Sequence, residues 1–303
     1  MSKRCATLVL VTAVIIGLIA FGNPCAAAPA ANGLKAWFKA DTLGLSDGSA
    51  VSAWADSSGN GNDLSQSNAA QQPIFKTNAL NGIAAVRFNG TLGGVHSFLT
   101  SSDNASLAST EFSIFIVMSS HGDQPMWGSV AYMAPTSSWD NNGVSVGWME
   151  NYMSTSHNMC FPGVPVSSSL GHQDQDSATW WHSWESGVME FDLGSQASDI
   201  MSYRNGVASN KTVNLTGEPG DFTAASRGIA LGGRPDYSGS DFAGYVCEVL
   251  IYDHKVSQEE RYQTGTYLGG KYGIDVVPEP SGILALLGGL VGLSQITRRR
   301  INR

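Results

Sequence analysis

Residues 244–252 read GYVCEVLIY, and this stretch decides the fold class. β-Branched and aromatic residues crowd into it, as they do in the strands of a sandwich. Six other short stretches share its apolar alternation: KAWFKA (35–40), AAVRF (84–88), FSIFIVMSS (112–120), VSVGW (144–148), DIMSY (199–203) and GIALGG (228–233). Turn-forming clusters such as DSSGNGND (56–63) and YRNG (203–206) separate the stretches. The pattern predicts an all-β fold, a two-sheet antiparallel jelly-roll sandwich.

One short helix is expected near the C-terminal end, over SQEERYQTGTYLGGKYG (257–273). Ser257 fits the N-cap, and Glu260 three residues later completes a capping box. Gly273 marks its end. Composition agrees with a strand-rich domain, since 35 of the 303 residues are glycine and only 14% are charged.

The N-terminal end has the organisation of a secretory signal peptide over residues 1–27. The basic start MSKR precedes an apolar run over residues 8–21 and small residues over 25–28. We expect cleavage after Ala27, because cleavage one residue later would leave Pro29 at the first position. Export follows from this reading. An uncleaved membrane anchor is the alternative, which the shortness of the apolar run disfavours.

Charge is distributed unevenly along the chain. Without the two basic ends, 11 basic and 24 acidic residues remain, a net charge of about −13. Such a surface repels nucleic acid and anionic lipid and suits divalent cations. Two cysteines, Cys160 and Cys247, lie outside the signal peptide. They predict either one disulfide or two buried free thiols.

The C-terminal end, VPEPSGILALLGGLVGLSQITRRRINR, joins a proline-bracketed acid to an apolar run and four arginines. The apolar run over 283–296 is short for a membrane span. The following arginines fit a cytoplasmic stop, and a C-terminal helix buried against the domain is the alternative. The order Val277, Pro278, Glu279, Pro280, apolar run and basic end resembles the PEP-CTERM sorting signal.

That resemblance covers residues 277–303 and implies cleavage of the tail by an exosortase in a Gram-negative bacterium. This cleavage would follow export of the chain and removal of its signal peptide by signal peptidase. It implies transient inner-membrane anchoring by a transmembrane tail, then release to the cell surface or the extracellular polysaccharide matrix.

The body of the chain resembles the laminin-G-like, concanavalin A-like lectin and glucanase jelly roll over residues 33–274. The stretches GLKAWFKADTL, VSAWADSSGNGNDLSQ, GIAAVRFNG and the region from Arg227 to Ile274 carry this resemblance. It implies carbohydrate binding, adhesion or glycan hydrolysis. The family places an acidic pair before its last strand, where this chain has Cys247 and Glu248, so any metal role of the first acid is lost.

A loop over residues 56–63 offers a set of hard oxygen ligands. The candidates are Asp56, Asn60, Asn62 and Asp63. Calcium takes six to eight such oxygens on flexible loops, so calcium is the cofactor that the sequence predicts. The alternative is a turn in which Asp56 and Asn60 bond the backbone.

The stretch ATWWHSWESGVMEFDLG, over 178–194, suggests a sugar-binding platform. Trp180, Trp181 and Trp184 offer flat faces for sugar rings, and His182 offers hydrogen bonds. The alternative is burial of at least one tryptophan in the core.

The same stretch places two carboxylates, Glu190 and Asp192, on one strand face. Glucanases of this fold carry Glu-x-Asp-x-x-Glu, and here Ser195 stands where the second glutamate belongs. No catalytic residue is therefore predicted. We expect a non-catalytic protein that binds a glycan through loops at one edge of the sandwich. A glycoside hydrolase and a structural matrix protein are the alternatives.

Overall fold

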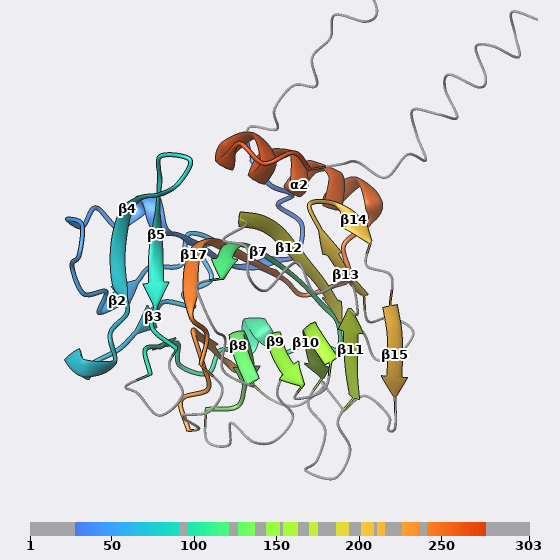
Figure 1. Cartoon of the computed structure of the whole chain (residues 1–303), viewed down its shortest axis with the longest axis horizontal. Coiled ribbons are helices and arrows are strands. Elements are labelled where there is room, and N and C mark those ends of the chain that lie inside the picture. The colour runs from blue at the N-terminus through green and yellow to red at the C-terminus, as the bar shows by residue number, and fades with distance from the viewer. Residues whose placement is uncertain are drawn as a thin grey trace, which may run out of the picture.

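The computed structural model describes residues 28–90, 96–120, 127–136, 144–151, 154–162, 170–174, 186–193, 201–208, 211–215, 226–236 and 241–276. These residues form two antiparallel sheets and one α-helix, which confirms the predicted sandwich (Figure 1). The signal peptide and the sorting tail lie outside the described residues, so both stay predictions.

Sheet A has eight described strands in the order β14-β13-β12-β7-β17-β5-β4, with β1 also paired to β17. Its members are β1 (Leu34–Lys39), β4 (Ile74–Leu80), β5 (Ile83–Phe88), β7 (Phe112–Ser120), β12 (Ser186–Leu193), β13 (Met201–Arg204), β14 (Val207–Ala208) and β17 (Gly244–Tyr252). The GYVCEVLIY stretch is therefore the strand β17, and it pairs with β1, β5 and β7.

Sheet B has nine described strands in the order β15-β11-β10-β9-β8-β16-β6-β3-β2. They are β2 (Ala53–Trp54), β3 (Leu64–Ser65), β6 (Leu99–Thr100), β8 (Trp127–Ala134), β9 (Val144–Asn151), β10 (Ser154–Pro162), β11 (Leu170–Asp174), β15 (Lys211–Leu215) and β16 (Gly228–Leu231). Short 3-10 turns are η1 (Ala40–Thr42), η2 (Ala69–Gln71) and η3 (Ala105–Leu107).

The main core lies between the two sheets. Alternation along each strand sends one set of side chains inward, including the fully buried Phe38, Trp54, Phe112 and Phe242. Burial of one such large aromatic side chain contributes roughly 2–3 kcal/mol. The core thus fixes which strand positions face outward.

The helix α2 (Gln258–Tyr272) covers the outer face of sheet A, and Figure 1 shows it on the side away from β8–β11. A second apolar cluster fills this layer, with Leu268 and Tyr272 of α2 against Phe115 and Leu250 of the sheet. The helix begins and ends as predicted. Ser257 and Glu260 form the capping box, and Gly273 has a left-handed φ of 64° at the C-cap.

Both ends of the described chain rest on α2. At the N-terminal end, the Ala30 N–H donates to Thr264 Oγ1 at 3.2 Å, and the Tyr252 hydroxyl donates to the Ala30 carbonyl at 3.0 Å. At the other end, Val276 folds back onto two helix glycines. A Cβ at Gly265 or at Gly269 would lie 3.0 Å from a methyl carbon of Val276. These glycines, which weaken a helix by propensity, are needed for this close approach.

Candidate functional site

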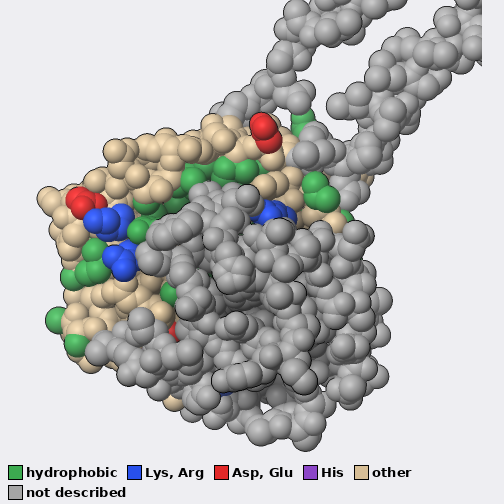
Figure 2. Space-filling model, viewed as in Figure 1, with side chains coloured by type: hydrophobic (Ala, Val, Ile, Leu, Met, Phe, Trp, Pro, Cys, Tyr) green, Lys and Arg blue, Asp and Glu red, His purple; other side chains and the backbone are tan. Residues whose placement is uncertain are grey.

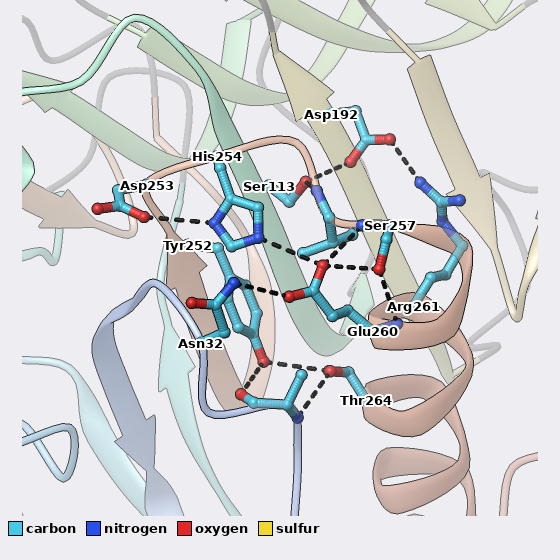
Figure 3. A network of polar contacts seen from close by, with 12 residues as sticks. Asn32, Ser113, Asp192, Tyr252, Asp253, His254, Ser257, Glu260, Arg261 and Thr264 are labelled. Carbon is cyan, nitrogen blue, oxygen red and sulfur yellow. Dashed lines mark hydrogen bonds and ion pairs between the residues drawn. The ribbon is translucent and has the colours of Figure 1, made fainter.

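The predicted carboxylate pair, Glu190 and Asp192, lies in a buried network beneath α2, and Figure 3 shows the Asp192 part of this network. Arg261 of the helix donates from Nε to Glu190 and from Nη2 to Asp192, each at 2.6 Å. The guanidinium also lies 4.1 Å from the ring centroid of Tyr203. Glu190 and Asp192 share a strand face as predicted, and that face is covered by the helix.

Burial sets the ionisation of this pair. It raises the pKa of Glu190 well above its usual range, with the Asp192 charge adding to the effect and Arg261 opposing it. Burial likewise raises the pKa of Asp192, again opposed by Arg261. The side chains of Glu190 and Asp192 are only 3% and 0% exposed, and both bind Arg261 of α2. A sugar therefore has no access to either carboxylate at that position.

The network continues to the beginning of α2. Asp192 accepts a bond from the Ser113 hydroxyl, which in turn accepts the Val256 N–H at 3.0 Å. Glu260 then caps the helix, accepting the Ser257 N–H at 2.8 Å. Although desolvation opposes it, these donors lower the pKa of Glu260 to about 2. Strand β12 and the helix start are thus fixed to one another.

A second buried carboxylate, Glu248, anchors the other end of α2. It accepts from Trp37 Nε1 at 2.5 Å, from the Tyr267 hydroxyl at 3.0 Å and from the Tyr272 hydroxyl at 2.8 Å. Lys271 Nζ lies 2.7 Å from the same carboxylate. The neighbouring Cys247 is a buried free thiol, and its pKa is raised to about 12 by burial.

Cys247 is a free thiol, which argues against the predicted Cys160–Cys247 disulfide and agrees, for this cysteine, with the alternative of two buried free thiols. Cys247 faces the helix on the outer side of sheet A, whereas Cys160 belongs to β10 in sheet B. The inter-sheet core separates these two positions, which places a disulfide out of reach.

The predicted calcium loop is tied together by hydrogen bonds around Asp56. Its carboxylate accepts four of them, from Trp37 N at 2.9 Å, Ser58 N at 2.8 Å, Ser58 Oγ at 2.8 Å and Asn62 N at 3.0 Å. Asp63 accepts the Asp56 N–H at 2.7 Å. This is the arrangement of a structural turn.

The two asparagines of the loop bind neighbouring backbone. Asn60 Nδ2 donates to the Leu34 carbonyl at 3.0 Å, and Asn62 Nδ2 donates to the Lys35 carbonyl at 2.8 Å. Within the described residues, no group of three or more His, Cys, Asp or Glu side chains could hold a metal. Calcium binding here stays a prediction, and the ion would have to compete with the donors that already occupy Asp56.

Substituting Asp56 by alanine is expected to lower the free energy of unfolding by about 1–3 kcal/mol, because several amide donors lose their acceptor. Urea denaturation in EDTA measures this, with Ser57→Ala on the exposed neighbouring side chain as the matched control. Repeating both series in calcium tests the metal. A calcium-dependent gain seen in the wild type and lost in Asp56→Ala would show that the loop is also a metal site.

The Asp56 loop and the strand that follows the tryptophan-rich stretch lie at opposite rims of the sandwich. The loop contacts the beginning of β1, where Leu34 pairs with Tyr252 at the end of β17. Strand β12 begins at the other end of the sheet, where Ser186 pairs with Ser119 and Gly244 pairs with Ser120. The tryptophans themselves lie outside the described residues, so the expectation of one binding edge that includes both groups stays a prediction.

Trp180, Trp181, His182 and Trp184 precede β12 in the sequence and lie outside the described residues. Their role in carbohydrate binding stays a prediction. Ser195 also lies outside the described residues.

A buried histidine–carboxylate pair lies at one rim of the sandwich. Strands β7 and β16 end at this rim, and β8, β12 and β17 begin there. We call it the His96 rim. His96 Nδ1 lies 2.6 Å from Asp241 Oδ1, and the two side chains are 8% and 1% exposed. The His96 ring also packs on Phe98, with ring centroids 4.7 Å apart. The second carboxylate oxygen, Asp241 Oδ2, is buried and has no hydrogen-bond partner among the described residues.

An arginine–tyrosine stack lies next to this pair, on the outer face of sheet B. Tyr132 points outward, because its neighbour Met133 enters the core. Arg234 covers the ring of Tyr132 at 5.5 Å from its centroid, and Asp236 accepts two bonds from the guanidinium at 3.1 and 2.8 Å. Arg234 and Asp236 are part-exposed, with side chains 22% and 33% accessible. Asp241 and β8 connect the two groups through the bridge of Asp241 to Ser129.

Sequence reasoning missed this rim. His96 and Asp241 are 145 positions apart and belong to no spaced motif. The only signal was the turn-rich stretch GGRPDYSGSD (232–241) after the predicted strand GIALGG, since functional side chains concentrate in such connections.

On the face drawn in Figure 2, the charged side chains of the described residues are few, and a basic group lies beside an acidic one at the left, so they form no single charged patch there. Of the helices that the structure describes, none has the length and apolar character needed to span a bilayer.

Comparison with known proteins supports the fold and goes no further. No protein-family model matches the chain, and no curated protein matches it. Among solved structures, domain 4 of AbnA, a GH43 extracellular arabinanase from Geobacillus stearothermophilus in complex with arabinotriose, superposes with a TM-score of 0.50 at 15% identity. The match covers 77% of this chain and 98% of that domain.

A second similar structure is that of botulinum neurotoxin type C, whose cell entry depends on two ganglioside molecules. Its TM-score is 0.52 at 9% identity, over 78% of this chain and 51% of the toxin chain. The fold class is thus a two-sheet β-sandwich. At these identities the likeness concerns the fold alone.

Proposed function

We propose that the protein is a non-catalytic glycan-binding module that acts through the His96 rim. The observation that carries this proposal is the Arg234–Asp236 pair stacked over Tyr132. Arg234 and Asp236 are part-exposed and supply hydrogen-bond donors and acceptors for sugar hydroxyls, and Tyr132, only 7% exposed beneath Arg234, holds the guanidinium in place. The ligands named for the two similar structures, arabinotriose and gangliosides, are in keeping with such a role.

The absence of catalysis in this proposal is supported by the position of the one carboxylate pair that suggested hydrolysis. Glu190 and Asp192 are buried under α2 and bound by Arg261. Export by the signal peptide, transient anchoring by the PEP-CTERM tail and release to the cell surface or matrix complete the proposal, and they rest on the sequence of residues 1–27 and 277–303.

The test is retention of the full chain, kept in solution with detergent, on polysaccharide extracted from the producing organism's matrix. Arabinotriose serves as a competing soluble ligand, and new reducing ends are assayed in the same tubes. Arg234→Ala is expected to lower the affinity about tenfold or more, because it removes a charge-assisted donor and the cover of Tyr132. Lys76→Ala is the matched control, since Lys76 forms a similar part-exposed ion pair with Asp47.

Equal retention of wild type and Arg234→Ala would exclude the His96 rim as the contact. New reducing ends would instead indicate a hydrolase. If Glu190→Gln still produced new reducing ends, the catalytic acid of that hydrolase would be a residue other than Glu190. Failure of the wild type to bind any tested polysaccharide would leave a structural matrix protein.

A further inference from the structure

We propose that His96 Nε2 is the hydrogen-bond acceptor for a hydroxyl of a neutral sugar, with Asp241 as the positioning residue that keeps this nitrogen available. The inference rests on the proposed function and names one contact within it.

Asp241 determines the tautomer of His96. A carboxylate oxygen only accepts hydrogen bonds, and Asp241 Oδ1 lies 2.6 Å from His96 Nδ1. The proton of the neutral ring therefore resides on Nδ1. A carboxylate that holds one ring nitrogen in this way leaves the other with a lone pair directed away from it.

The His96–Asp241 pair is buried. Asp241 is 1% exposed, and its Oδ2 atom has no hydrogen-bond partner in the part of the chain that the structure describes. A buried carboxylate with a single bond is costly in a domain whose other two buried acidic centres are satisfied by Arg261 and Lys271. Buried polar groups left under-satisfied in a native fold are characteristic of functional sites, where binding requires a particular charge distribution.

The orientation of the His96 ring, and with it the direction of Nε2, is fixed by its neighbours. His96 Nε2 has no hydrogen-bond partner among the described residues, and the ring retains 8% of its surface. Phe98 packs on the ring and restricts its rotation. The ring is therefore held from two sides, and its only unused polar atom is an acceptor.

An acceptor of this kind selects the chemistry of the ligand. A sugar hydroxyl donates to a neutral imidazole nitrogen, whereas a carboxylate or phosphate offers no proton and would face the buried Asp241 charge. The nearby Arg234 is already bound bidentately by Asp236. The local charges of the two pairs thus favour a neutral glycan over an acidic one.

Two substitutions at His96 separate the two ring nitrogens. An asparagine amide can replace Nδ1 as a donor to Asp241 but does not reach the position of Nε2. We expect His96→Asn to keep the unfolding midpoint near that of the wild type and to lose about tenfold in affinity for the extracted polysaccharide, as expected for one lost hydrogen bond. Asp47→Asn, at a part-exposed ion pair with Lys76 that has no role in the proposed contact, is the comparison for a general effect of substitution.

Asp241→Asn tests the positioning role by spectroscopy. Its amide can donate to Nδ1, so the proton is expected to move to Nε2. Long-range proton–nitrogen NMR spectra of the full chain in detergent should show Nδ1–H in the wild type and Nε2–H in the variant. His96→Asn assigns the resonances by removing them.

A wild-type ring protonated on Nε2 alone would overturn the inference without affecting the proposed function. Full affinity in His96→Asn, with Arg234→Ala impaired, would do the same. If the wild type retains no polysaccharide, the proposed function and this contact both fail. A stoichiometric shift of the Nε2 resonance on adding zinc would replace the sugar by a metal.

Discussion

Replacing Arg261 by leucine is expected to destabilise the domain by about 3–5 kcal/mol at neutral pH. The substitution leaves Glu190 and Asp192 buried without a cation, because Arg261 supplies the 2.6 Å bond to each of them. It also removes the guanidinium packed on Tyr203. Urea denaturation followed by far-UV circular dichroism measures the change.

The pH dependence gives this prediction a signature. The pKa of Glu190 is already raised by burial, so the folded state holds its proton more tightly than the unfolded chain does. Stability contributed by this group is fully present below the unfolded pKa of about 4.5 and is lost as pH rises through the higher folded pKa. Without Arg261 that loss becomes larger. The cost of Arg261→Leu should therefore shrink toward pH 4.

Two controls make the result specific. Lys76→Leu breaks an exposed ion pair of similar length with Asp47 and should cost less than about 1 kcal/mol. Adding Glu190→Gln and Asp192→Asn to Arg261→Leu should recover part of the lost stability, because it removes both unpaired charges. A cost for Arg261→Leu no larger than that of Lys76→Leu would contradict the buried network.

Replacing Glu248 by leucine is expected to have a comparable effect, about 3–5 kcal/mol. Leucine fills similar space but accepts no hydrogen bond, so the buried Tyr272 hydroxyl and Trp37 Nε1 lose their acceptor. Lys271 loses its buried ion-pair partner and keeps its contact with the more exposed Asp41, at 3.1 Å. Near-UV circular dichroism should lose aromatic signal together with the fall in unfolding free energy.

Glu248→Gln offers a graded comparison. The amide retains one acceptor oxygen in the same place, so we expect a loss about half as large. Glu259→Gln, on the exposed side of the first turn of α2, should change stability by less than about 1 kcal/mol. Equal stability of Glu248→Leu and Glu259→Gln would show that the hydrogen bonds to Glu248 contribute nothing.

The fold could be predicted from the sequence because its signals are local. Alternation in GYVCEVLIY and the capping box of Ser257 and Glu260 depend on neighbours within a few residues, and both were confirmed. The shared strand face of Glu190 and Asp192 was also foreseen. The covering of that face by Arg261 was not, because it depends on a contact 69 to 71 residues away.

The candidate site could be predicted from the sequence less well than the fold, because its contacts are not local. The loop over residues 56–63 has the composition of a calcium site. Only the three-dimensional arrangement shows that the Asp56 oxygens already accept hydrogen bonds from backbone amides. His96 and Asp241 carry no motif, and their meeting follows from strand order alone. Chemistry assembled across distant strands leaves no periodic trace in a single sequence.

The seating of both described ends on α2 determines how the domain is presented. Ala30 and Val276 lie on the helix side of sheet A, and the Arg234–Tyr132 stack lies on the outer face of sheet B, with the whole thickness of the sandwich between them. A support that holds the chain by either end therefore leaves the Arg234 face directed away from itself. The same placement allows circular permutation, since a short linker across α2 could join the ends while new ones open at a part-exposed turn such as Asn205–Gly206.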